Sequence, residues 1–350
     1  MGLTYLTFLS SGLFLGWSLG ANDVSNIFGV AVGSKMLKFK TAALIASIFI
    51  ILGAVFGGSG TTATLASLGE VNAVAGSFMV ALSAALSVYF MTKTGLTTST
   101  SQAIVGAIIG WNLFADKATN TTALVKIVSG WVLCPFLSAL MAILLYLLLK
   151  YAFKKMHLHM LMQHQVLRIG LIFAGAFCTY ALGANNIANV MGVFVQTAPF
   201  NTLHIGTLHF SPMQILFFLG ALAISSGIFT YSHKVMDTVG KNVMKMSPFV
   251  ALVVVLAQAC VLFLFSSSTL KNALASLGLP TIPLVPVSST QAVIGAILGI
   301  GLFKGGRGIN WSITSRIVIG WFSTPLISLL ICFICLFVLQ NVFNLTVFIP

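Results

Sequence analysis

Residues 20–30 read GANDVSNIFGV and residues 183–193 read GANNIANVMGV, so six of the eleven positions are identical. Both stretches carry Asn or Asp inside long apolar runs, where polar side chains are costly at membrane depth. A second copy of such a polar stretch is the first sign of an internal repeat.

Two further stretches return in the same order along the chain. SQAIVGAIIGWNLF at 101–114 returns as TQAVIGAILGIGLF at 290–303 with eight of fourteen positions identical. IVSGWVLCPFLS at 127–138 returns as IVIGWFSTPLIS at 317–328 with six of twelve identical. The offset grows from 163 in the first block to 189 and 190 in the others. The second copy therefore carries about 26 additional residues, part of which we expect in the polar stretch 232–247.

The composition excludes an ordinary soluble domain. Of 350 residues, 17 are Lys or Arg and 4 are Asp or Glu, so that 6% are charged and 58% are hydrophobic, with a mean hydropathy of +1.07. Soluble domains have about 25% charged residues. Apolar stretches of about 20 residues, the length that crosses a bilayer, recur along the whole chain, which indicates a multi-pass membrane protein.

The apolar stretches predict five membrane segments in each half of an all-α protein. Because five is odd, the second half must enter the membrane upside down, and inverted repeats with matching polar interruptions are typical of secondary transporters. We expect broken or re-entrant helices that meet at the midplane. The predicted units are a first repeat at 1–149, a basic connection at 150–167 and a second repeat at 168–350. The segments are 3–32, 41–57, 71–92, 95–114, 124–149, 168–193, 213–232, 248–267, 285–303 and 314–343.

The basic residues predict the orientation in the membrane. They lie singly in short connections instead of on one face, which speaks against nucleic acid as a partner. If the connection 33–40 is cytoplasmic, alternation places 14 of the 17 basic residues on the cytoplasmic side, as the positive-inside rule requires. The sequence therefore predicts a cell-membrane protein with both termini extracytoplasmic.

The first polar block of each repeat is predicted to interrupt a helix. A Gly-Ala-Asn start would let the helix break and restart, exposing backbone groups to a ligand. Asn22 and Asn26, like Asn185 and Asn189, are four residues apart and project from one helix face, which should line a cavity. The alternative is that these amides only hold neighbouring helices together.

The second polar block of each repeat precedes a helix of small residues. It reads TTSTSQ at 97–102 and SSTQ at 288–291. Hydroxyls at such positions cap helices, and a helix N-terminus binds anions without Lys or Arg. Two inverted repeats would direct two such N-termini at one midplane site. A role in capping alone is the alternative.

Asp23 is the only carboxylate within a repeated block. A buried carboxylate beside a bound anion is repulsive unless a cation lies between them or the carboxylate is protonated. The oxygens of Asp, Asn, Ser and Thr suit a small hard cation, so anion transport should be coupled to Na⁺ or H⁺, with Na⁺ at Asp23. The alternative is that Asp23 only caps a helix.

With these blocks in view, the chain resembles the inorganic phosphate transporter family of ion-coupled phosphate permeases. The paired blocks at 20–23 and 183–186 are similar to its duplicated signature, and PVSSTQ at 286–291 is similar to its hydroxyl element. The resemblance implies symport of inorganic phosphate with Na⁺ or H⁺ by alternating access, without an enzyme activity or a further cofactor. It implies phosphate binding by Asn22, Thr100, Ser101, Gln102, Asn185, Ser289, Thr290 and Gln291, and cation binding by Asp23, Asn26, Asn186 and Asn189.

Three departures from the family pattern leave alternatives open. Asn186 stands where many members repeat the Asp, Gln258 stands where a Glu is expected, and the chain is short, as in sulfate permeases. Sulfate is therefore the alternative substrate, and an uncoupled anion channel is a second alternative. An enzyme is not expected, because the spans contain no HExxH, no paired catalytic carboxylates and no nucleophile with a base. The oligomeric state is open, with a homodimer among the alternatives.

Overall fold

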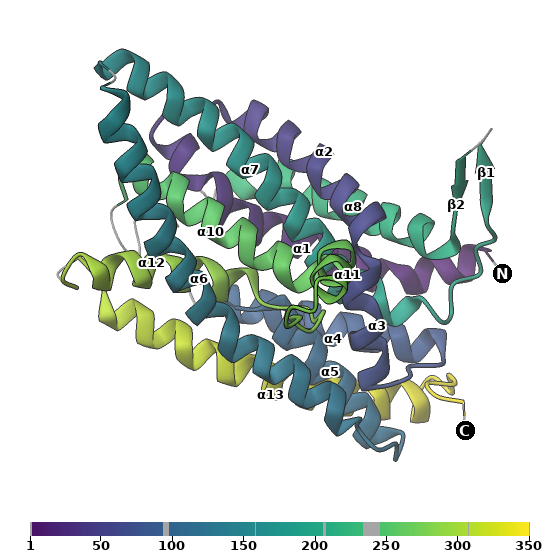
Figure 1. The fold of residues 1–350 in the computed structure, drawn as a ribbon. Coiled ribbons are helices and arrows are strands. Elements are labelled where there is room, and N and C mark those ends of the chain that lie inside the picture. The colour runs from purple at the N-terminus through teal and green to yellow at the C-terminus, as the bar shows by residue number, and fades with distance from the viewer. Residues whose placement is uncertain are drawn as a thin grey trace.

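The structure is a computed structural model that describes residues 2–93, 98–157, 159–205, 208–233, 246–306 and 308–349. Thr97 of the first hydroxyl block and residues 234–245 of the polar stretch lie outside these ranges. The described chain forms a bundle of helices with one small hairpin (Figure 1). The first half contains α1 (Gly2–Gly33), α2 (Phe39–Gly57), α3 (Ser59–Leu68), α4 (Val74–Lys93), α5 (Thr100–Phe114) and α6 (Thr121–Met156).

The second half contains α7 (Met160–Met191), the 3-10 turn η1 (Gly192–Phe194), β1 (Leu203–Ile205), β2 (Leu208–Phe210), α8 (Pro212–Thr230), α10 (Pro248–Ser266), α11 (Ser268–Ser276), α12 (Ser289–Phe303) and α13 (Trp311–Asn341). The strands β1 and β2 pair antiparallel. Each of the ten predicted segments corresponds to one helix, whereas α3, α11 and the hairpin were not predicted. The predicted connection 150–167 consists mostly of the ends of α6 and α7, which continue as helices on both sides of a short turn.

The helices differ in whether their length and apolar character suit a membrane span. Within the described residues, seven helices are long and apolar enough to cross a membrane: α2, α4, α6, α7, α8, α10 and α13. The helices α5 and α12 have 15 residues each and are about 22 Å long at 1.5 Å per residue. Because a bilayer core is about 30 Å thick, neither can cross it alone. An all-helical membrane fold is thus confirmed.

The two halves pack through exchanged partners. The helix α1 packs on α8 of the second half, and α7 packs on α2 of the first half. In the same way α5 packs on α13, and α12 packs on α6. Both ends of the chain lie at the end of the bundle that carries the hairpin, opposite the α6–α7 and α12–α13 turns (Figure 1). Each half is therefore completed by helices of the other.

Glycines at these crossings correct one prediction. The helices α1 and α7 run without a break through Gly20 and Gly183, where we expected interruptions. A Cβ atom on Gly20 would lie 1.9 Å from the carbonyl oxygen of Ile224 in α8, and one on Gly183 would lie 2.4 Å from that of Ile50 in α2. The glycines are needed because a neighbouring backbone lies against them. The interruptions in the fold instead precede α5 and α12.

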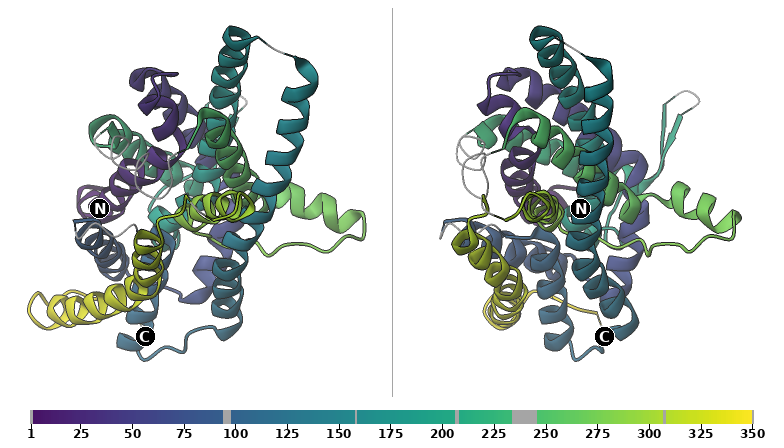
Figure 2. Two further views of the ribbon diagram at one scale, coloured as in Figure 1. Left: turned by 90° about the vertical axis from the view of Figure 1, so that its left-hand side faces the viewer. Right: turned by 60° about the vertical axis from the view of Figure 1, so that its left-hand side comes forward.

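The extra length of the second half is also not where it was expected. The segment 231–247 between α8 and α10 has 17 residues, against 16 in the segment 58–73 between α2 and α4. The additional residues form the hairpin region 192–211 and the connection 267–288, which contains α11. None of the residues of α11 is buried, and Figure 2 shows this helix projecting from the side of the bundle.

Candidate functional site

The candidate site lies where the short helices α5 and α12 begin. Ser99 and Ser288 are the N-cap residues, and each side-chain oxygen accepts a hydrogen bond from the backbone N–H three residues further on, at 3.3 Å in both helices. The predicted N-capping is confirmed. Because the two caps are supplied by these serines, the hydroxyls of Ser101 and Thr290 in the first turns are left for other contacts.

Ser101 and Thr290 join the two helix starts to each other. The Ser101 hydroxyl donates to the Val287 carbonyl at 3.0 Å, and the Thr290 hydroxyl donates to the Thr98 carbonyl at 2.9 Å. The two donors, Ser101 and Thr290, are 189 residues apart, and so are the two acceptors, Thr98 and Val287. Because 189 is the offset of the repeated block, the two bonds are reciprocal. Both helix N-termini, with unsatisfied N–H groups and partial positive charge, therefore meet at one place, which is a suitable anion site.

Asp23 of α1 contacts the first turn of α12. Its Oδ2 atom accepts a hydrogen bond from the Ser289 hydroxyl. The side chain is only 4% exposed, and a buried carboxylate requires a proton or a cation to offset the loss of hydration. The structure thus brings together the one acidic group of the repeated blocks and the second hydroxyl block.

Three side chains from α5 and α7 are joined to one another by hydrogen bonds. The Ser101 hydroxyl has two acceptors, the Val287 carbonyl at 3.0 Å and Asn186 Oδ1 at 3.4 Å, and Ser101 Oγ accepts from Asn189 Nδ2 at 2.8 Å. The same amide nitrogen donates to Asn186 Oδ1 at 2.9 Å. Among the described residues, Asn186 Nδ2 and Asn189 Oδ1 then have no partner, although both side chains are fully buried. One free donor and one free acceptor remain.

Asn185 lies against the segment that leads into α12. Its Oδ1 atom accepts from the Val287 N–H at 3.1 Å, and its Nδ2 atom donates to the Val285 carbonyl at 3.5 Å. Both ends of the amide hold the extended segment that leads into α12. Its backbone carbonyl accepts from the Thr61 hydroxyl at 3.2 Å. In this conformation Asn185 supports the site instead of offering a free polar group to a ligand.

Asn22 and Asn26, the matching residues of α1, lie at the edge of the site. Both are half-buried, and Asn22 Nδ2 donates to the Ser18 carbonyl of its own helix at 3.1 Å. Within the described residues, neither is hydrogen-bonded to the first turns of α5 and α12. The two halves of the site are thus similar in sequence but unequal in contacts.

Gln258 of α10 belongs to the site, although its sequence position marked it only as a departure from a family pattern. Its Nε2 atom donates to the Ser289 carbonyl at 3.4 Å, and its Oε1 atom is buried without a partner in the described structure. Asp23 and Gln258 therefore both contact Ser289 at the start of α12. Within the described chain no group of three or more His, Cys, Asp or Glu is placed to hold a metal ion. The oxygens suit a hard cation such as Na⁺.

The remaining predicted residues line the first turns. Thr100 is buried at the start of α5, and Gln102 and Gln291 are buried in the third positions of α5 and α12. The side-chain oxygens of both glutamines have no partner in the described structure, and both residues line a groove between α6 and α13.

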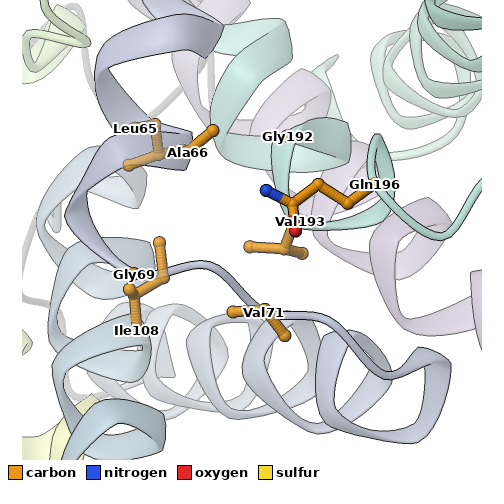
Figure 3. A pocket seen from close by; sticks show the side chains of 8 residues that line it. All are labelled: Leu65, Ala66, Gly69, Val71, Ile108, Gly192, Val193 and Gln196. Atoms are coloured by element: carbon orange, nitrogen blue, oxygen red, sulfur yellow. The ribbon is translucent and has the colours of Figure 1, made fainter. Parts of the chain in front are cut away.

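A narrow pocket lies one helical turn beyond Asn189, between the end of α7 and the helices α3 and α5. Figure 3 shows Val193 facing Leu65 across it, with Ile108 at the lower wall. Its volume of about 10 Å³ is about the least that admits one water molecule. In the conformation described, this pocket is therefore too small to hold a phosphate ion.

These features define a class of protein, a multi-pass membrane transporter in which two short helices begin at one buried polar site. The sequence profile of the phosphate transporter family matches residues 19–332. The chain belongs to this family, as its repeated blocks predicted.

Individual relatives agree with the family assignment. The chain is 27% identical over 323 residues to a protein of Methanocaldococcus jannaschii named as a phosphate permease, covering 92% of this chain and 93% of that protein. It is 29% identical over 333 residues to a protein of Bacillus subtilis named as a low-affinity inorganic phosphate transporter, covering 93% of each chain. A solved structure titled as the sodium-dependent phosphate transporter is similar in fold, with a TM-score of 0.75 and 23% identity over 96% of this chain and all of that one.

Proposed function

We propose that the protein carries inorganic phosphate across the cell membrane in symport with Na⁺ by alternating access. The observation that carries the proposal is the reciprocal pair of bonds from Ser101 and Thr290, which joins two helix N-termini beside Asp23. The N-termini attract the anion, and the carboxylate attracts the cation. Names of relatives as phosphate permeases and transporters support the choice of substrate.

The resemblance assigned Asn186 and Asn189 to the cation, but we assign their free groups to the anion, where they favour phosphate over sulfate. Asn186 Nδ2 can donate to an oxygen of either anion, but Asn189 Oδ1 needs a donor. Phosphate retains a P–OH group at neutral pH, whereas sulfate has no proton to donate. A buried acceptor without a partner costs about 1–3 kcal/mol, which corresponds to a preference for phosphate of roughly 5-fold to 150-fold.

Na⁺ is the coupling ion that the oxygens around Ser289 suit best. Asp23 supplies the negative charge, and Gln258, which contacts the same first turn, carries an uncommitted neutral oxygen in Oε1. The similar fold titled as sodium-dependent agrees with this choice. A proton on Asp23 is the alternative that an experiment must distinguish. Asn26 is the second candidate for the cation. It lies four residues after Asn22, the neighbour of Asp23, and therefore on the same helix face as Asn22.

The division into inverted repeats at 1–149 and 168–350 is part of the proposal. The exchanged partners of α1 and α7 and the reciprocal bonds support it. Rocking of one repeat against the other would open the site alternately to each side. The proposed orientation, with both termini extracytoplasmic, rests on the basic connections.

Uptake of labelled phosphate by proteoliposomes tests the substrate. We expect saturable uptake that excess unlabelled phosphate removes, and a half-inhibiting concentration of sulfate at least about 5-fold higher than that of unlabelled phosphate. Protein-free liposomes and liposomes containing Asp23→Asn protein serve as controls. Equal competition by sulfate would contradict the role given to Asn189, and absence of saturable phosphate uptake would contradict the function.

A further inference from the structure

Two histidines face each other across the hairpin of β1 and β2. His204 of β1 is directly opposite His209 of β2 in the antiparallel register. Opposite residues of such a pair project from the same face, with their Cβ atoms about 4.5–5.5 Å apart. The two imidazole rings lie edge to face with their centroids 4.6 Å apart, and both side chains are exposed. The hairpin therefore holds two imidazoles together where solvent can reach them.

The atoms that meet are the Nδ1 nitrogens of the two rings, which are 2.6 Å apart. A hydrogen bond between two neutral imidazoles needs one N–H donor and one lone pair, so one ring donates its Nδ1 proton and the other accepts it. If the donating ring carries its proton on Nε2 instead, both Nδ1 lone pairs face the same point. This change of tautomer neither takes up nor releases a proton.

The separation of the two nitrogens is close to that of two ligands on one metal ion. Metal–nitrogen distances are about 2.0–2.1 Å for histidine. At angles of about 90–110° between the ligands, as in square-planar and tetrahedral sites, the two nitrogens are about 2.8–3.4 Å apart. From the observed 2.6 Å, the Nδ1 atoms of His204 and His209 need to separate by only about 0.2–0.8 Å. Small side-chain rotations of two exposed residues are sufficient for this.

We propose that His204 and His209 bind one divalent ion of the late first transition series, such as Zn²⁺ or Cu²⁺, through their Nδ1 atoms. Imidazole suits these ions, whereas Mg²⁺ and Ca²⁺ require oxygen ligands. Within the described residues no third His, Cys, Asp or Glu joins the pair, so water occupies the remaining positions around the ion. The ion is therefore held at the protein surface and exchanges with solution.

The pair lies at the end of the bundle that carries both ends of the chain (Figure 1). The hairpin connects η1, which follows α7, to α8, which packs on α1. Each strand has only three residues, and an isolated two-stranded hairpin is marginally stable. A metal ion bound by both strands would therefore fix this connection. The binding does not depend on which ion or anion the protein carries, because the pair is separate from Asp23 and the starts of α5 and α12.

Electron paramagnetic resonance of Cu²⁺ tests the proposal on the whole purified protein in detergent, prepared without a polyhistidine tag. The probe is the Cu²⁺ complex of iminodiacetate, in which the chelator leaves positions free for two imidazoles. We expect one complex per chain, with the nitrogen couplings of two imidazoles. His204→Gln and His209→Gln should each bind the probe at least about tenfold more weakly, because the second imidazole of the pair is an intramolecular ligand.

A matched double variant controls for binding by other histidines. His159→Gln/His164→Gln alters two exposed residues at the start of α7, near the opposite end of the bundle, and should bind the probe like wild type. Because His204 and His209 are exposed, their single variants should melt like wild type without metal, so that weaker binding reports a lost ligand. Zn²⁺ should displace the probe at concentrations at which Mg²⁺ and Ca²⁺ have no effect.

Two results would overturn the proposal. Equal affinity of the wild type and His209→Gln for the probe would show that the two rings do not bind one ion together. Loss of binding in His159→Gln/His164→Gln, with binding retained in His209→Gln, would place the metal site at the turn between α6 and α7 instead of the hairpin.

Discussion

Replacing Asp23 by Asn is the sharpest perturbation of the site. The substitution keeps the shape of the side chain, and the amide oxygen can still accept from the Ser289 hydroxyl. It removes one negative charge. A cation about 2.4 Å from a carboxylate oxygen is attracted by about 7 kcal/mol at an effective dielectric constant of about 20. With half of this offset by dehydration, the loss of about 3 kcal/mol weakens Na⁺ binding by more than 100-fold.

The assay measures phosphate uptake as a function of Na⁺ concentration, together with the thermal unfolding of the purified protein with and without Na⁺. For Asp23→Asn we expect no Na⁺-driven uptake, no stabilisation by Na⁺ and an unfolding temperature close to that of the wild type without Na⁺. Asp116→Asn is the matched control, since this exposed carboxylate lies in a turn with a positive φ of 51° that Asn also adopts. Unchanged Na⁺ dependence in the Asp23→Asn variant would refute the assignment of the cation site.

Three further substitutions test the architecture of the site. Thr290→Val removes a hydroxyl without changing the shape of the side chain and leaves the buried Thr98 carbonyl unpaired. We expect the KM for phosphate to rise about 5-fold or more and to recover in Thr290→Ser. An unchanged KM would limit this hydroxyl to a structural role. Asn185→Ala removes the two hydrogen bonds that hold the segment before α12. It should lower the stability by about 2–4 kcal/mol, measured by thermal unfolding. A melting curve like that of the wild type would show that these bonds do not stabilise the segment. Gly20→Ala places a methyl group 1.9 Å from the Ile224 carbonyl oxygen and should lower the stability by about 1–3 kcal/mol. Gly33→Ala is the control, because nothing lies within 4 Å of the added methyl group, and it should melt like wild type. Equal melting temperatures of the two variants would contradict the close helix crossing.

The positions of the membrane helices could be predicted because the signal is local. Runs such as 41–57 and 248–267 are mostly apolar and contain no charged residue, and the corresponding helices α2 and α10 begin and end within two residues of them. The starts of α5 and α12 were harder to place within longer apolar segments, although Ser99 and Ser288 carry a recognisable cap signal. The family was also recognisable, because its repeated blocks are specific as a set.

The contacts of the site could not be predicted, because they depend on residues that are distant in the sequence. Gly20 suggested a break in the helix, but the sequence does not show that Ile224 lies against it. Asn185 and Asn22 occupy the same position of the repeated motif, yet only Asn185 meets the segment before α12. Gln258 offered a usable signal, since it is the one amide in the apolar run of α10.

The most direct test of the account is uptake of labelled phosphate into proteoliposomes at fixed pH, with an inward Na⁺ gradient in one sample and an equal K⁺ gradient in the other. The account predicts transient accumulation of phosphate above the external concentration with Na⁺ alone, and its collapse when the Na⁺ gradient is dissipated. Equal uptake in both samples, with no accumulation above the external concentration, would contradict Na⁺ coupling and the place given to Asp23.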